Sequence, residues 1–555
     1  MDKTRILIAA LTVLSTACAD DPSSSSGDTA STDPTTTADA GQTTDASNSN
    51  AETLEDTTPD MALEPDGPWT LTWEPCEVSA FGDQVVEARC AEVEAPLEWT
   101  EPDGETIALF TRHIPASGDI LGRSVWLLTG GPGFSGLSLE PLGVLLSQQG
   151  FDVYVSDHRG TGRSTLLGCL DVEAPDSDGG TAMTGAEYIA CQQEVIDTWG
   201  AERLSSFNSR NAAHDLGAFI ASVHAPSEPV FVMGISYGTY LAHRYLQYYP
   251  EQSTGVIMDS ICPPGGCLLS EQDRWYDRTA ERFMTQVCAT DPLCREKLGP
   301  DPWARVGEMH TMVRGGHCIQ VGLPGATNSF LRGLLGSLLL NARLRVALPA
   351  VVYRNLRCSD EDRAALENLY FGGGGGGGGG GIADYSPFLA HNIGVSELWI
   401  KRGAPELTRD EVLDFYNATY VANGVSAQLA NELDVWPRYD DPDTERLATT
   451  DIPLLMLNAE LDPATPLEIA QPLQEHFQGE HQHFLTFPHA SHNIWLQSSI
   501  DGQPSALCGL RVIVDFMTDP TADPRHPCID DIWPPNFAGD PGMAEGLFGR
   551  DDLWE

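Results

Sequence analysis

The sequence predicts an α/β protein with a mostly parallel sheet and an inserted, mainly helical cap. Short, continuous apolar runs alternate with stretches of helical periodicity, the alternation stops between about residues 262 and 450, and it then resumes. Continuous apolar runs are typical of strands that are buried on both faces of a parallel sheet, which requires helices on both sides. A chain of 555 residues also exceeds one simple core, so we expect two folded units with accessory segments.

Residues 1–18 are expected to be an export signal. Two basic residues precede an apolar stretch from Ile6 to Leu14, and small residues then lead to Cys18. The apolar stretch is too short to span a bilayer. The pattern resembles a bacterial lipoprotein signal, although Ser15 stands where such signals usually have Leu. It implies lipidation of Cys18 and attachment to a membrane of the cell envelope; ordinary secretion after cleavage near Ala17 is the alternative.

Residues 19–66 are expected to form a disordered tether. They are rich in Ser, Thr, Asp, Ala and Gly, so they cannot bury a core. The globular pattern that follows predicts a first core part at 67–261, a helical cap at 262–450 and a second core part at 451–555. Ten consecutive glycines, Gly372 to Gly381, should form a mobile loop in the cap.

The cysteine count supports export. Thirteen cysteines without Cys18 leave twelve, an even number that suits an oxidising compartment. No Cys-x-x-Cys pairs have zinc-site spacing, so we expect no metal. Proximity in the sequence suggests the pairs Cys76–Cys90, Cys169–Cys191, Cys262–Cys267, Cys288–Cys294, Cys318–Cys358 and Cys508–Cys528.

The net charge of −49 comes from 80 acidic and 31 basic side chains. Such a polyanion repels nucleic acid and favours cationic ligands such as the amino termini of peptides, so nucleic acid is not an expected partner. Much of this charge is also expected to be solvated surface. The sequence makes no prediction of the oligomeric state.

The expected core elements follow one another along the chain. The predicted strands are Thr106–His113, Ser124–Leu128, Asp152–Ser156, Val230–Met233, Gly255–Met258, Pro453–Leu457 and His483–Phe487. The predicted helices of the core are Ser209–Val223 and Gly238–Tyr249, and those of the cap include Arg274–Cys288, Phe330–Arg345 and Arg409–Tyr416.

The stretch "PVFVMGISYGTYLAHRYLQYYP" (229–250) places Ser236 between a strand and a helix. Glycines at 234 and 238 let the chain reverse without Cβ clashes, and the turn presents the serine oxygen above the sheet. The pattern predicts a nucleophile elbow. The alternative is a glycine-rich turn that happens to expose a serine.

An activated serine needs donors for an oxyanion as well as a base and an acid that orients the base. "VWLLTGGPGFSG" runs from a strand into Gly130–Gly133, where residues without side chains let a backbone amide approach the substrate. We expect the amides of Gly131 and Tyr237 to be these donors. The alternative for the glycines is a mere turn.

The acid and the base are expected after the cap, in the chain order serine, acid, histidine. "IPLLMLNAELDPATP" ends an apolar strand at Asp462, the preferred acid, with Glu460 in reserve. "HFLTFPHASHN" places His489 and His492 in the loop after another strand, and His492 is the better candidate for the base. The alternatives are an aspartate that caps the turn and a solvent-facing histidine.

Residues 127–270 and 450–535 resemble the α/β-hydrolase family of prolyl iminopeptidases and, more closely, exported bacterial tripeptidyl aminopeptidases. The matching segments are Gly130–Gly133, "DHRGTGRS" (157–164), "GISYGT" (234–239), "DPATP" (462–466) and the tail "LCGLRVIVDFMTDPTADPRHPC" (507–528). The resemblance implies an α/β-hydrolase fold, with Ser236 as nucleophile, Asp462 as acid and His492 as base, and no cofactor.

The chain departs from that family in places. Thr129 stands where the family often has His, Ser491 where it often has Gly, and the glycine run is unlike it. Cap carboxylates of the family bind the substrate's amino terminus, and "IGVSELWIK" implies Glu397 for this role. The alternative is a surface pair of Glu397 with Lys401, at i, i+4 on a helix.

The sequence therefore predicts an exported serine aminopeptidase, of prolyl or tripeptidyl type, that hydrolyses short peptides. An esterase or lipase would use the same triad. A catalytically silent binding protein tethered to the envelope is the alternative of a different class.

Overall fold

The computed structural model describes residues 66–80, 85–173, 177–178, 183–318, 328–372 and 384–555. The expected signal, Cys18, the tether and most of the glycine run lie outside the described residues. Within the described ranges, no helix is both long and apolar enough for a membrane span.

The centre of the molecule is a nine-stranded sheet in the order β1-β2-β3-β5-β4-β6-β7-β8-β9. Strands β1, β2, β3 and β5 pair antiparallel, and from β5 through β9 all neighbours are parallel. The mostly parallel sheet of the predicted fold is confirmed. The bounds are β1 Glu74–Ser79, β2 Val85–Pro96, β3 Thr106–Ile114, β4 Ser124–Leu128, β5 Asp152–Asp157, β6 Val230–Ile235, β7 Gly255–Asp259, β8 Leu454–Ala459 and β9 Gln482–Phe487.

Two hydrophobic cores cover the two faces of this sheet. Along β6, Val230 and Val232 point into one core, whereas Phe231 and Met233 point into the other. Successive side chains of a strand lie on opposite faces of the sheet, and both faces are buried here. The sequence of β6 is therefore a continuous apolar run. The first core includes α3 (Gly185–Leu204), α4 (Ser209–Val223) and α5 (Tyr237–Tyr248), and the second includes α2 (Glu140–Ser147) and α18 (Cys508–Thr518).

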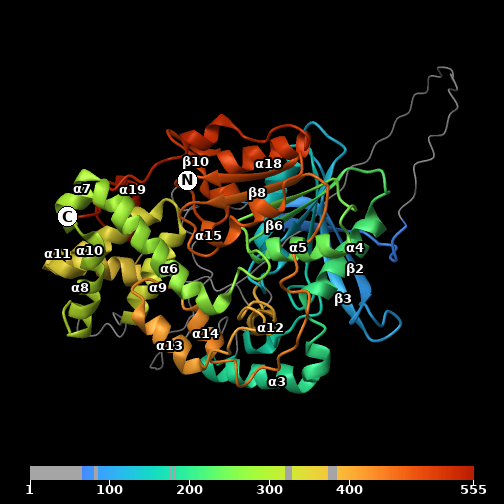
Figure 1. Ribbon diagram of the computed structural model, residues 1–555, viewed down its shortest axis with the longest axis horizontal. Coiled ribbons are helices and arrows are strands. Elements are labelled where there is room, and N and C mark those ends of the chain that lie inside the picture. The colour runs from blue at the N-terminus through green and yellow to red at the C-terminus, as the bar shows by residue number, and fades with distance from the viewer. Residues whose placement is uncertain (1–65, 81–84, 174–176, 179–182, 319–327, 373–383) are drawn as a thin grey trace, which may run out of the picture.

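The cap lies between β7 and β8 in the chain and beside the sheet in space (Figure 1). It has a third hydrophobic core of its own, and the carboxyl-terminal helix α19 (Pro541–Phe548) returns from the sheet to pack into it. The cap helices are α6 Gln272–Arg282, α7 Pro292–Leu298, α8 Pro302–Arg314, α9 Asn328–Leu340, α10 Leu348–Arg357, α11 Asp360–Glu367, α12 Pro387–Ser396, α13 Arg409–Ala418 and α14 Val425–Ala430. The short helices α15 Leu467–Ala470, α16 Leu473–His476 and α17 Ile494–Gln497 follow β8 and β9.

Two cap helices are shorter than predicted. α6 ends at Arg282 and continues as a π-helical turn at Phe283–Val287. α9 ends at Leu340 rather than Arg345, because the side chain of Asn341 accepts from the amides of Arg343 (2.9 Å) and Leu344 (3.0 Å) and starts a new turn. An Asn side chain that bonds to nearby backbone in this way competes with helix continuation.

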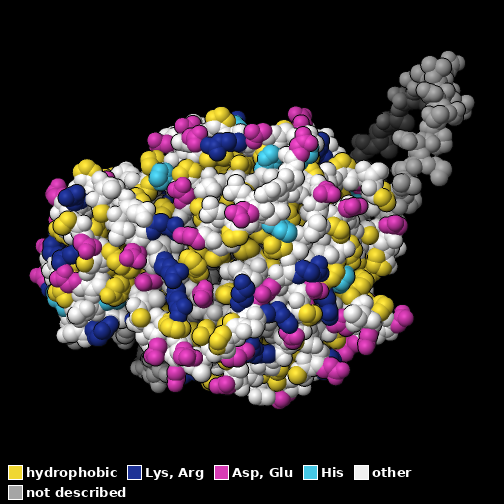
Figure 2. Space-filling model, in the orientation of Figure 1, with side chains coloured by type: hydrophobic (Ala, Val, Ile, Leu, Met, Phe, Trp, Pro, Cys, Tyr) yellow, Lys and Arg dark blue, Asp and Glu magenta, His cyan; other side chains and the backbone are white. Residues whose placement is uncertain are grey.

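The described part of the chain has six disulfides, and all six predicted pairs are confirmed. Acidic side chains are spread over the visible face with basic ones among them (Figure 2). On that face the excess of acid is distributed rather than gathered in one patch.

Candidate active site

Ser236 lies at a sharp bend between β6 and α5 and adopts φ 57° and ψ −125°. This backbone conformation is costly for a residue with a side chain and typically occurs at functional positions. A Cβ on Gly234 would lie 2.2 Å from the carbonyl oxygen of Gly238, and one on Gly238 would lie 2.2 Å from that of Leu128. The bend therefore requires glycine on both sides of the serine.

The Gly130–Gly133 loop follows β4 and touches the serine. A Cβ on Gly130 would lie 3.0 Å from Cβ of Ser236, and Gly131 has a φ of 113°. Among the described residues, neither the amide of Gly131 nor that of Tyr237, the first residue of α5, donates to a protein acceptor. Both amides therefore have no protein acceptor within the described ranges, and their role as oxyanion donors stays a prediction.

The structure brings His492 and Asp462 together. His492 Nδ1 lies 2.9 Å from Asp462 Oδ2, and because a carboxylate can only accept, Nδ1 carries the proton and Nε2 is the basic nitrogen. Asp462 also accepts from the amides of Ala464 (2.8 Å) and Thr465 (2.9 Å). The buried carboxylate of Asp462 therefore both caps the turn, as the alternative expected, and contacts the imidazole that it would orient.

Asp462 sets the protonation behaviour of the imidazole. Burial opposes the charged form of His492, but the charge of Asp462 and its hydrogen bond outweigh burial, so the pKa of His492 is raised above its usual value of 6.5. An imidazole that gains a proton more readily is suited to act as a general base.

Ser236 and His492 are held at the same edge of the sheet by Asp259, at the end of β7. The amide of Ser236 donates to the Asp259 carbonyl (3.0 Å), and the Asp259 carboxylate accepts from the amides of Ile494 and Trp495, both at 2.8 Å. Burial raises the pKa of Asp259 to about 6. Among the described residues, no hydrogen bond joins Ser236 Oγ to His492.

Sequence reasoning missed Asp259. Its position at the end of a buried strand next to the serine strand was the available signal, because the carboxyl ends of parallel strands meet at one edge.

Glu460 and His489, the reserve acid and the other candidate base, form no hydrogen bond or ion pair with each other among the described residues. Glu460 is exposed, and its amide donates to the carbonyl of Phe487 (3.1 Å). His489 contacts Arg345 through its carbonyl oxygen rather than through its ring. Of the two predicted choices, the structure therefore favours Asp462 with His492.

Glu397 is buried at the end of α12, only 7% exposed. Its carboxylate accepts from the amide of Ser209 (2.8 Å) and from the hydroxyls of Tyr240 (2.9 Å) and Tyr439 (2.6 Å). The alternative of a surface pair with Lys401 was wrong, because α12 ends at Ser396 and the carboxylate turns inward to these donors. Binding of a substrate amino group by Glu397 stays a prediction.

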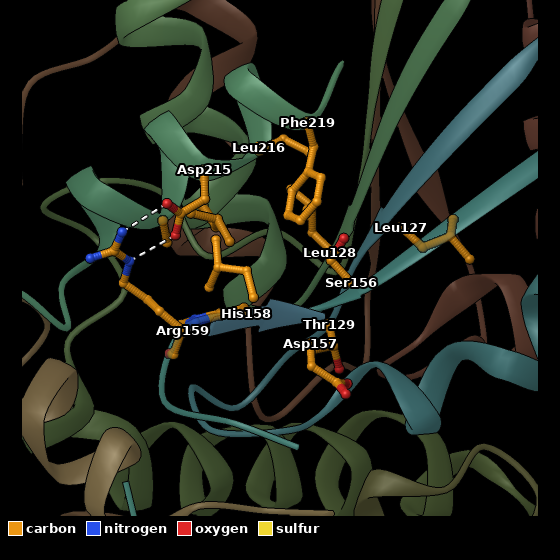
Figure 3. Close-up of a pocket in the computed structure, with 13 residues that line it drawn as sticks. Leu127, Leu128, Thr129, Ser156, Asp157, His158, Arg159, Asp215, Leu216 and Phe219 are labelled. Carbon is orange, nitrogen blue, oxygen red and sulfur yellow. Dashed lines mark hydrogen bonds and ion pairs between the residues drawn. The ribbon is translucent and has the colours of Figure 1, made fainter. Parts of the chain in front are cut away.

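Arg159 of the "DHRGTGRS" segment has a structural role. Its guanidinium is buried and forms two 2.7 Å hydrogen bonds with Asp215, which Figure 3 draws as dashed lines. The cavity beside it, about 30 Å³, is lined by neither Ser236 nor His492. It has room for about one water molecule and is too small for a peptide.

The comparisons with known proteins agree with this geometry. Residues 124–295 match the family model described as alpha/beta hydrolase fold, and residues 420–526 match the one described as TAP-like protein. Serine protease Hip1 of Mycobacterium tuberculosis is 26% identical over 262 residues, which cover 44% of this chain and 49% of the relative.

Two further relatives carry different names. Tripeptidyl aminopeptidase of Streptomyces coelicolor is 26% identical over 229 residues, 38% of this chain and 41% of the relative. Carboxylesterase B of M. tuberculosis is 25% identical over 269 residues, 44% of this chain and 49% of the relative. The chain thus spans about half the length of the curated relatives it matches. The sheet order, the strained serine bend and the match of residues 124–295 show the α/β-hydrolase fold, and residues 420–526 are similar to the TAP-like family model.

Proposed function

We propose that this protein is an exported serine aminopeptidase that hydrolyses short peptides through Ser236, His492 and Asp462. The observation that carries the proposal is the 2.9 Å pair of His492 with Asp462, on a loop that Asp259 ties to the strained serine bend. The relatives named serine protease and tripeptidyl aminopeptidase favour a peptide substrate over an ester.

The mechanism is acyl transfer. His492 Nε2 takes the proton of the Ser236 hydroxyl, whose oxygen attacks the peptide carbonyl, and the Gly131 and Tyr237 amides stabilise the oxyanion. The imidazolium is stabilised by Asp462 and then gives its proton to the departing amine. Water, deprotonated by the same imidazole, releases the acyl group and restores the serine.

An aminopeptidase also has to recognise a protonated amino group. Glu397 is the candidate in the cap, and each of its three hydrogen bonds comes from a neutral donor. An ammonium group would have to replace one of the tyrosine hydroxyls. The acidic composition of the whole chain adds a general attraction for cationic peptide termini.

The test is hydrolysis of aminoacyl and tripeptidyl anilides with free or acetylated amino termini. We expect cleavage of the free substrates, weak or no cleavage of the acetylated ones, and no activity in Ser236→Ala. Labelling by a fluorophosphonate should occur at Ser236 in the natural protein and be absent in that variant. Equal cleavage of free and acetylated substrates would contradict the aminopeptidase, and a serine that cannot be labelled would favour the silent binding protein.

A carboxylesterase is the second candidate, favoured by the relative named carboxylesterase B. The triad fixes acyl transfer but not the leaving group. Short acyl esters of p-nitrophenol, assayed beside the anilides, separate the two candidates. Hydrolysis of esters without any cleavage of anilides or peptides would favour the esterase.

A further inference from the structure

A second, larger cavity of about 360 Å³ lies between the cap and the carboxyl-terminal segment, beside the His492 loop. Four segments line it: the turn after α9, the His492 loop with α17, the hairpin of β10 (Ser499–Ile500) with β11 (Gln503–Leu507), and the segment that leads into α19. The labels β10 and α19 in Figure 1 mark two of these parts of the chain. Its volume is within the range of sites that bind small organic ligands.

Arg343 places a positive charge in the lining of this cavity. Its guanidinium is half-buried and stacks on Trp533, 4.6 Å from the ring centroid, and among the described residues it has no ion pair. Its Nε is buried without a hydrogen-bond partner. A buried, unsatisfied N–H is costly, and a guanidinium matches a carboxylate with two parallel hydrogen bonds.

The other titratable side chains that line the cavity, Asp540 and His489, form no ion pair with Arg343. Asp540 lines it too, but its carboxylate caps α19 by accepting the amide of Met543 (2.8 Å) and makes no ion pair with Arg343. Burial and the nearby Arg345 lower the pKa of His489, which is therefore neutral at pH 7. The charge of Asp540 does act on Arg343 and opposes the lowering of its pKa by burial. Arg343 is thus a cation without an ion pair among the described residues, in a lining that also has polar side chains and whose apolar members include Val346, Leu507, Ile532, Trp533 and Met543.

The cavity borders the loop that carries the catalytic histidine. Neither Ser236 nor His492 itself lines it, but His489 and Asn493, which flank His492 in the chain, do. The oxyanion loop packs elsewhere, against the start of α12, where the rings of Phe134 and Tyr385 are 4.8 Å apart. In acyl transfer the carbonyl oxygen faces the oxyanion donors, whereas the departing amine faces the imidazole that protonates it.

We propose that this cavity binds the leaving portion of the peptide substrate, with an apolar side chain against Trp533 and its prolines and the terminal carboxylate at Arg343. The proposal rests on the proposed function and deepens it. It predicts a preference for short peptides, because a carboxylate reaches Arg343 only when the chain ends within the cavity.

The experiment compares kcat/KM for short peptides of one sequence that end in a free carboxylate or in an amide. In the natural protein we expect the carboxylate form to be preferred about tenfold, mainly through KM, because it gains a charge-assisted pair. Arg343→Gln should reduce this preference to about one. Arg305→Gln, which removes an exposed cap arginine paired with Glu308, should keep it.

Each outcome bears on the proposal. If the natural protein cleaves both peptides equally well, or if Arg343→Gln keeps the preference, the cavity assignment is overturned while the aminopeptidase stands. If esters are hydrolysed but neither peptides nor anilides, the proposed function fails, and the assignment fails with it. Should Arg343→Gln not fold, Trp533→Leu removes the stacking partner of the guanidinium, and an unchanged preference in that variant overturns the proposal.

Discussion

His492 and Asp462 show how one carboxylate determines the chemistry of an imidazole. Burial of the imidazole favours its neutral form, and the charge of Asp462, its hydrogen bond and the charge of Asp259 together reverse that tendency. Catalysis needs the neutral imidazole as base, so activity should fall as pH drops through its raised pKa.

Asp462→Asn therefore has two expected effects. kcat should fall by about three to four orders of magnitude, because the amide neither stabilises the imidazolium nor keeps Nε2 as the free nitrogen. The acidic limb of the pH profile should move to lower pH, since the charge of Asp259 is then left to oppose the effect of burial on the imidazole. A profile of kcat/KM from pH 4 to 9 measures both. An acidic limb that does not move would contradict this account of His492.

Arg345 is a further residue that acts on the histidine loop. Arg345 is fully buried in the cap turn after α9. Its guanidinium donates to the carbonyl of His489 and to that of Ala490 (3.1 Å). It has no carboxylate partner among the described residues. Burial lowers the pKa of this guanidinium to about 9. It ties the cap to the loop that carries the catalytic base.

Arg345→Met should leave two carbonyls without their donor, at a cost of about 1–3 kcal/mol each, and loosen the loop. We expect a lower midpoint of thermal unfolding together with a lower kcat and an altered pH profile. Arg345→Lys, which can still donate, should recover part of both. A Met variant that loses stability but keeps the pH profile of the natural protein would limit Arg345 to a structural role.

At the scale of elements, local patterns predicted seven of the nine strands of the central sheet. The seven predicted strands exist, with ends shifted by at most two residues, because each is a compact apolar run. β1 and β2 were missed, since β2 alternates buried and exposed residues and so lacks that pattern. The predicted end of a cap helix was wrong at Asn341, because its side chain bonds to the following backbone amides and starts a new turn.

The strand-to-helix bend makes a prediction for Gly238. Gly238→Ala would press a Cβ against the Leu128 carbonyl, so we expect a loss of about 1–3 kcal/mol of stability and slower fluorophosphonate labelling of Ser236. Gly333→Ala is the matched control, because a Cβ at this position of α9 meets nothing within 4 Å. It should gain up to about 1 kcal/mol. Equal unfolding midpoints for the two variants would contradict the steric argument.

For the whole molecule, the six disulfides favour folding in an oxidising compartment, in line with the proposed export. Their contributions should differ with loop length. Cys318–Cys358 closes 40 residues and should contribute about 4 kcal/mol, whereas Cys262–Cys267 closes 5 and should contribute about 2 kcal/mol. Replacing each pair by Ser and measuring the free energy of unfolding tests this order. The reverse order would show that local packing outweighs loop entropy.

By itself the sequence determined the fold class and the bend at Ser236, because these follow from periodicity and steric limits within short segments. It suggested the disulfide pairs by proximity, and the structure confirmed them. Only the tertiary structure decided what Asp259, Arg345 and Glu397 contact. Each meets partners far away in the chain, so no local pattern reports whether its charge is exposed, paired or buried. The cavity beside Arg343 belongs to the same class, since it exists only where the cap, the histidine loop and the carboxyl-terminal segment come together.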